Sequence, residues 1–149
     1  MEIVHLLRAV TVELGMHSAR FAQRNGMHPT DVRALIALMD AARAGEETTA
    51  GQLGAALGLN SAGTTALVDR LERAGHVRRV RSDRDRRKVT VTVDERAVAL
   101  GWQHFGPLID RAVDLLHGYD ARELAAIRGF LTGMREAAQE DRQQATGSA

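Results

Sequence analysis

Apolar side chains recur at helical spacing through most of the chain and alternate at a spacing of two in one short segment. Over residues 3–21 they fall three or four positions apart, at Ile3, Leu7, Val10, Leu14 and Phe21, with His17 standing where one more apolar residue is due. This pattern predicts a long first helix with one narrow apolar stripe.

A second helix is predicted after the break at His28, Pro29 and Thr30, and it ends near residues 44–47. Its predicted packed face carries Val32, Leu35, Ile36 and Met39. The pattern so far is entirely helical.

Two shorter helices follow, separated by a turn of a few residues. Thr49 and Gln52 form a capping box that opens the first, and Gly58 is a C-terminal stop for it. Asn60 can cap the second, which runs from Ser61 to about residue 74 and ends at Gly75. Its predicted buried positions are Thr64, Leu67, Val68 and Leu71.

The period-2 segment comes next. Valines at 89, 91 and 93 alternate with threonines at 90 and 92, which predicts a strand. We expect a hairpin over residues 76–93 with residues 82–88 at its tip. Two short helices followed by a basic hairpin are the layout of a winged helix-turn-helix.

Beyond Asp94 the chain returns to helix. One stripe carries Val98, Trp102, Phe105, Ile109, Val113 and Leu116, and a second follows the capping box of Asp120 and Glu123 with Leu124, Ile127, Leu131 and Met134. From about residue 137 the apolar stripe is lost, which predicts a frayed end. We therefore predict a mainly α single domain over 1–149. It comprises a winged helix-turn-helix lobe at 30–94, flanking helices at 1–28 and 95–137, and a frayed tail at 138–149.

The flanking helices predict a homodimer, because their narrow apolar stripes have to be buried and the small central lobe cannot cover them all. In a two-fold dimer the two recognition helices address successive major grooves about 34 Å apart, so the DNA site is pseudo-palindromic. The competing interpretation folds both ends onto a monomeric core.

The distribution of charge indicates what the protein binds. The segment Arg70 to Lys88 holds nine of the twenty cationic side chains and three acids, a net charge of +6 in a chain of net charge +1. This concentration of positive charge predicts binding to double-stranded DNA.

At this point the sequence resembles the MarR family of bacterial transcriptional regulators. The stretch LVDRLERAGHVRRVRSDRDRRKVTVTV, Leu67 to Val93, is similar to the family's recognition-helix end and wing, with Asp85, Arg86 and Arg87 as its DRR tripeptide. Asp94 and Ala97 depart from the Thr and Gly that the family commonly places there. The resemblance implies a winged-helix dimer that represses transcription and that often releases DNA when a small molecule binds between the dimerisation helices and the DNA-binding lobe.

The predicted recognition helix offers few groups that hydrogen-bond to bases. Its outward face carries Ala62, Thr65, Ala66, Asp69 and Arg73. We expect Ser61 to contact a phosphate or a base and Thr65 a base edge or a thymine methyl. The two alanines can contact a thymine methyl or only give clearance for close docking.

Arginine supplies the remaining contacts. We expect Arg84, Arg86 and Arg87 at the hairpin tip to reach a minor groove, with Asp85 orienting Arg86 or Arg87 through a charge-assisted bond. The other arginines are candidates for phosphate contacts or for a solvated face, namely Arg70, Arg73, Arg78, Arg79 and Arg81.

A small aromatic or anionic effector is a further expectation. Its candidate pocket residues are His17, Arg20, Phe21, Trp102 and Phe105. The alternative for His17 is a hydrogen-bonded histidine of the core.

Other classes have little support. The chain has no cysteine, no phosphate-binding glycine loop and no nucleophile elbow, so we expect neither an enzyme nor a cofactor. No histidine pair has zinc-ligand spacing, and no metal site is predicted. No apolar run is long enough to span a membrane, and we expect a cytoplasmic protein. The sequence thus predicts a sequence-specific transcriptional regulator. A non-specific architectural DNA-binding protein and a metal-responsive regulator are the alternatives.

Overall fold

Helices account for most of the chain, and one hairpin interrupts them. The computed structural model describes residues 1–147. Its elements are α1 (Glu2–Arg24), α2 (Pro29–Arg43), α3 (Ala50–Leu57), α4 (Ser61–Arg73), β1 (Val77–Arg81), β2 (Val89–Val93), α5 (Glu95–Leu116) and α6 (Ala121–Gly147). The chain divides into two units, Met1–Leu100 and Gly101–Ala149. The predicted fold class is confirmed.

Local signals in the sequence set the ends of α3 and α4. The Thr49 N–H donates to Gln52 Oε1 at 2.8 Å and the Gln52 N–H donates to Thr49 Oγ1 at 3.2 Å, so the predicted capping box forms. Gly58 ends α3 in the left-handed conformation at φ 69°. Asn60 then caps α4, because its Oδ1 accepts the N–H of Gly63 at 2.8 Å.

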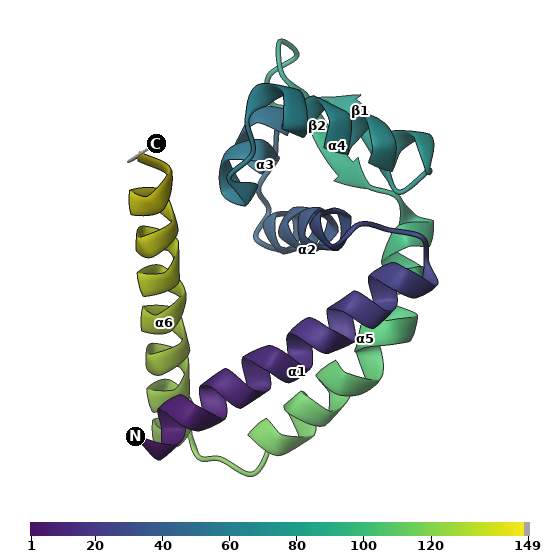
Figure 1. Cartoon of the computed structure of the whole chain (residues 1–149). Helices are drawn as coiled ribbons and strands as arrows, with labels where there is room; N and C mark the ends of the chain where they lie inside the picture. The colour runs from purple at the N-terminus through teal and green to yellow at the C-terminus, as the bar shows by residue number, and fades with distance from the viewer. Residues whose placement is uncertain (148–149) are drawn as a thin grey trace. The chain divides into compact units, whose positions relative to one another are not determined.

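The core of the first unit joins α2, α3, α4 and the hairpin, which Figure 1 shows gathered together. Its buried side chains are Ala34, Leu35, Leu38, Leu53, Leu67, Val68, Leu71, Val77 and Val91. The four buried positions predicted for α4 are all buried. On α2, however, Ile36 is 43% exposed, because the face that packs is centred on Ala34, Leu35 and Leu38.

The hairpin is attached to the chain before α3. β1 and β2 pair antiparallel, with Val77 opposite Val93 and Arg81 opposite Val89. The Val91 N–H donates to the Thr48 carbonyl at 2.8 Å, and Thr49 forms a bridge with Thr90. The wing therefore has a fixed base next to the start of α3.

The second unit contains most of α5 and all of α6. Asp120 and Glu123 form the predicted capping box, with both N–H to carboxylate distances at 2.8 Å. We predicted a frayed tail from residue 138, but α6 continues to Gly147, so the prediction is wrong for residues 138–147. Residues 138–147 contain three Gln and two Ala, which favour helix even without an apolar stripe. Residues 148–149 lie outside the described residues.

None of the helices in the described part of the chain has the length and apolar content needed to cross a membrane.

We expect Gly54→Ala to lower the free energy of unfolding by about 1–3 kcal/mol through overpacking between α3 and α4. An added Cβ would lie 2.0 Å from Thr64 Oγ1. That hydroxyl is held in place because it donates to the Asn60 carbonyl at 2.8 Å. Urea unfolding at one protein concentration measures the change.

Gly51→Ala is the matched control on the same helix, since its Cβ would approach no atom closer than 4.0 Å. We expect no loss of stability there. Equal free energies of unfolding for the two variants would contradict a tight crossing of α3 and α4.

Candidate nucleic-acid interface

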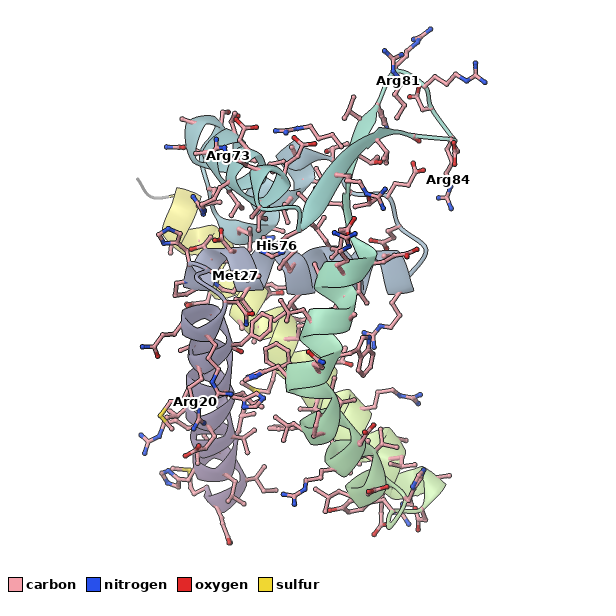
Figure 2. All side chains as sticks on the ribbon, turned by 90° about the vertical axis from the view of Figure 1, so that its right-hand side faces the viewer. Arg20, Met27, Arg73, His76, Arg81 and Arg84 are labelled. Carbon is pink, nitrogen blue, oxygen red and sulfur yellow. The ribbon has the colours of Figure 1, made fainter. Side chains whose placement is uncertain are left out.

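The exposed face of α4 is made mostly of small side chains. This face points outward because the opposite side of α4, with Leu67, Val68 and Leu71, is buried in the core. Its exposed residues are Ser61, Ala62, Thr65, Ala66, Glu72 and Arg73. The predicted contact residues Ser61 and Thr65 are therefore accessible, and Arg73 lies at the far end of the helix (Figure 2).

Arg70 lies at the edge of this face and is bound to Asp31 of α2. Its Nε donates to both carboxylate oxygens at 3.1 and 3.2 Å, and its Nη2 donates to Oδ1 at 2.5 Å. The Asp31 side chain is 4% exposed, and it also accepts the N–H of His28 at 2.9 Å. The hydrogen bond to Asp31 raises the pKa of Arg70 above its ordinary value. Arg70 thus ties α4 to the start of α2, and its contact with DNA stays a prediction.

Arg79 of β1 connects the hairpin to α4. Its guanidinium donates to Asp69 Oδ1 at 2.6 Å and to the Glu72 carboxylate, and its backbone N–H donates to Glu72 at 3.2 Å. The hydrogen bond to Asp69, with a smaller one to Glu72, raises the pKa of Arg79. Both carboxylates near the exposed face of α4 therefore have a cationic partner.

Ser82 organises the tip of the wing. This buried hydroxyl accepts the N–H groups of Arg84 and Asp85, both at 3.1 Å, and donates to Glu47 at 2.5 Å. Arg84 reaches back in the same direction, with Nη2 donating to the Gly45 carbonyl at 3.2 Å. Figure 2 shows Arg81 and Arg84 on the hairpin. The wing tip is thus attached to the loop between α2 and α3.

Asp85 orients the main chain of the tip. Its Oδ1 accepts the backbone N–H of Arg87 at 3.0 Å. We predicted that the Asp85 carboxylate accepts from the guanidinium of Arg86 or Arg87. Instead it accepts a backbone N–H, because an aspartate in a tight turn commonly accepts the N–H of the residue two positions later in the chain. Within residues 1–147 no carboxylate forms an ion pair with Arg86 or Arg87, and both are exposed.

Sequence analysis missed three residues that position the interface. They are Asp31, Glu47 and Ser82. Asp31 stands at the third position of α2, where a capping acid is expected, and this signal was available. Its bond to Arg70 spans 39 residues, and no periodicity indicates a contact at that separation.

The predicted pocket residues fall in both units. On α1, His17 is half-buried, Arg20 is exposed and Phe21 is buried. On α5, Trp102 is 51% exposed and Phe105 makes an edge-to-face contact with His104 at 4.8 Å between ring centroids. A shared pocket stays a prediction.

In the part of the chain that the structure describes, no three His, Cys, Asp or Glu side chains come together as a metal site would require.

Comparison of sequences identifies relatives over most of the chain. The sequence model of the MarR family matches residues 6–88. The uncharacterized HTH-type transcriptional regulator YcgE of Bacillus subtilis (strain 168) is 34% identical over 131 residues, which are 86% of this chain and 80% of that protein.

Solved structures show the same fold. A MepR mutant from a multidrug resistant S. aureus clinical isolate superimposes with a TM-score of 0.71 at 16% identity, over 91% of this chain and 96% of that one. The S. aureus MepR–DNA complex gives a TM-score of 0.58 at 16% identity, over 91% and 98% of the two chains. At these identities the similarity is one of fold.

We expect Asp31→Ala to lower the free energy of unfolding by about 2–3 kcal/mol. The variant loses the cap of α2 and leaves Arg70 without its charged acceptor, although Arg70 can still be hydrated because its side chain is 38% exposed. Urea unfolding at one protein concentration measures the change.

The control is Asp40→Ala, which removes an exposed ion pair with Arg43 on the same helix. We expect a loss below about 1 kcal/mol there. If the two variants lost the same small amount, the Asp31 contact would not hold α4 in place.

Proposed function

The chain belongs to the MarR family of transcriptional regulators, and on that premise we propose that it is a repressor that binds a pseudo-palindromic DNA site as a homodimer. Members of this family are DNA-binding proteins and not enzymes. The observation that carries the proposal is the placement of two DNA-contacting elements on one core. The N-terminal part of the outward face of α4 is uncharged, at Ser61, Ala62, Thr65 and Ala66. The wing presents Arg86, Arg87 and Lys88 to solvent.

The wing supports a contact with the minor groove. Ser82 and Asp85 fix the backbone of its tip, so the exposed Arg86 and Arg87 are held on a rigid base. A narrow, AT-rich minor groove concentrates negative potential and attracts guanidinium groups. MepR, which shares the fold, has been solved in complex with DNA, and this supports DNA as the partner. A location in the bacterial cytoplasm, where the DNA lies, is part of the proposal.

Exposed apolar surface on α1 supports the dimer. Ile3, Leu6, Val10 and Leu14 lie along one stripe and are 47–66% exposed. Such a stripe has to be covered by a partner helix. A second copy is the partner that also places two α4 helices at the spacing of successive major grooves.

The second unit carries further surface of this kind. A groove of about 630 Å³ runs along α6, lined by Leu116, Ala121, Leu124, Ala125, Ile127, Arg128, Leu131, Thr132 and Arg135. Its apolar floor fits a helix stripe from a second copy.

The last part of the proposal is that binding of a small molecule releases the protein from DNA. α1 brings an imidazole, a guanidinium and an aromatic ring within one turn of helix at His17, Arg20 and Phe21, and α5 adds Trp102 and Phe105. These groups suit an aromatic or anionic effector.

We expect a preference of about a thousandfold for the DNA upstream of the protein's own gene over a scrambled duplex. Fluorescence anisotropy at several salt concentrations measures both affinities. Equal, steeply salt-dependent binding to both duplexes would favour an architectural DNA-binding protein. No binding at low salt would contradict the assignment of the basic segment.

In the same assay Arg86→Ala should weaken binding to the preferred duplex by about 1–3 kcal/mol, because the minor groove loses an inserted cation. Arg8→Ala removes the same charge from α1 and should leave the affinity unchanged. Similar affinities for the two variants would exclude the wing from the contact.

We expect Val10→Asp to convert the dimer to a monomer, because the charge would be buried in the apolar stripe of α1. Size-exclusion chromatography with light scattering gives the mass directly. Val12→Asp is the matched control. It makes the same change at a similarly exposed position, 56% against 52%, about 200° around the helix. If both variants remained dimeric, α1 would not form the interface by this stripe.

A further inference from the structure

We propose that α4 reads its DNA site through the C5-methyl groups of thymines, by way of Ala62, Thr65 and Ala66, and not through hydrogen bonds to guanine. The inference rests on the proposed function, because it presumes a sequence-specific site. It names the chemical feature of the DNA that this helix selects.

The first step is the set of side chains that α4 can offer. Direct readout of guanine uses Arg or Lys, that of adenine uses Asn or Gln, and that of cytosine uses Asp or Glu. α4 contains no Asn, Gln, Lys or His. The hydroxyls of Ser61 and Thr65 can bond to any base edge and do not by themselves select one base. The charged candidates in α4 for such bonds are Asp69, Arg70, Glu72 and Arg73.

Three of these four are already bound within the lobe. The Arg70 guanidinium donates to the buried Asp31, with its shortest contact at 2.5 Å. Asp69 and Glu72 both accept from Arg79. If one of these side chains turned to bond to a base, its present partner would be left as an unpaired carboxylate or guanidinium. The free energy lost in this way would offset part of the free energy that the new bond gains.

Arg73 is too far along the helix. It lies twelve residues after Ser61, or about 18 Å along the helix axis. In a helix-turn-helix protein the N-terminal residues of the recognition helix contact the base edges, so Arg73 is placed to meet the backbone.

The side chains left at the N-terminal end carry hydroxyl and methyl groups. Asn60 is engaged as the cap of α4 through its Oδ1. Ala62, Thr65 and Ala66 are exposed, and Ala62 and Ala66 have no atom beyond Cβ. Small side chains let the helix axis approach the floor of the major groove, where the thymine methyl is the one apolar group that a base presents. A methyl buried against another methyl is worth about fourfold in affinity.

The experiment replaces thymine by uracil, which removes the C5-methyl and keeps every hydrogen-bonding group. The full-length protein first selects its site from a library of random duplexes. Each thymine of the selected site is then replaced singly, and the dissociation constant is measured at one salt concentration. We expect a loss of about fourfold at one or more thymines under α4 in each half-site, and no loss at thymines facing the wing, because the methyl lies in the major groove.

Variants of Thr65 assign the contact to the helix. Thr65→Ser removes the side-chain methyl and keeps the hydroxyl, so the uracil penalty at its thymine should fall to about onefold. Thr65→Val keeps a methyl and removes the hydroxyl, so the penalty should persist. Because Thr65 is exposed, neither change disturbs the core.

The outcomes separate the two proposals. Selection that yields no preferred sequence overturns the proposed function, and this inference with it. A preferred sequence whose affinity is unchanged by uracil at every position under α4 overturns the inference alone. So does a selected guanine under α4 whose replacement by 7-deazaguanine weakens binding tenfold or more, because guanine N7 would then be the group that is read.

Discussion

The burial of one stripe of α4 determines how the DNA-binding lobe is built. Leu67, Val68 and Leu71 are at most 2% exposed and pack with α2, α3 and the hairpin. Because a helix carries side chains all around its axis, fixing this stripe also fixes which residues face outward on the opposite side. The absence of a side chain at Gly54 lets α3 approach Thr64 closely, which sets the position of α4 along α3. The orientation of the outward face of α4, which we propose contacts the bases, is thus a consequence of core packing.

Five arginines of the basic segment form two groups that differ in what they contact. Arg70, Arg79 and Arg84 donate to acceptors inside the lobe, and they hold α2, α4, the hairpin and a loop together. Arg86 and Arg87 extend into solvent. The planar guanidinium suits the first group because it can bond to two acceptors at once. The pairing also neutralises Asp69 and Glu72, which would otherwise repel phosphates next to α4.

Sequence patterns identified the parts of this fold that depend on neighbouring residues. The caps at Thr49 and Asn60 and the stop at Gly58 were predictable because each signal lies within four residues of its partner. The extent of α6 was underestimated, since helix propensity alone continues the helix where the apolar stripe ends. The exposure of Ile36 and the bond between Asp31 and Arg70 depend on the tertiary arrangement of α2, which helical spacing does not determine. For the candidate site, the sequence indicated which residues are cationic, but it did not indicate which of them form ion pairs within the lobe.

The two units differ in how far their apolar side chains are buried. If a second copy covers the exposed ones, folding of the second unit and DNA binding depend on the same association. The first unit has a core of its own. In residues 101–145 the only buried residue is Gly106, which has no side chain. α5 and α6 carry large exposed hydrophobic residues such as Leu108, Val113, Phe130 and Leu131. Helices of this length gain most of their stability from packing an apolar face. In the homodimer that we propose, association with a second copy would supply that packing, and the same association would set the separation of the two α4 helices on DNA. The residues that stabilise α5 and α6 would then also determine which spacing of half-sites the protein can bind.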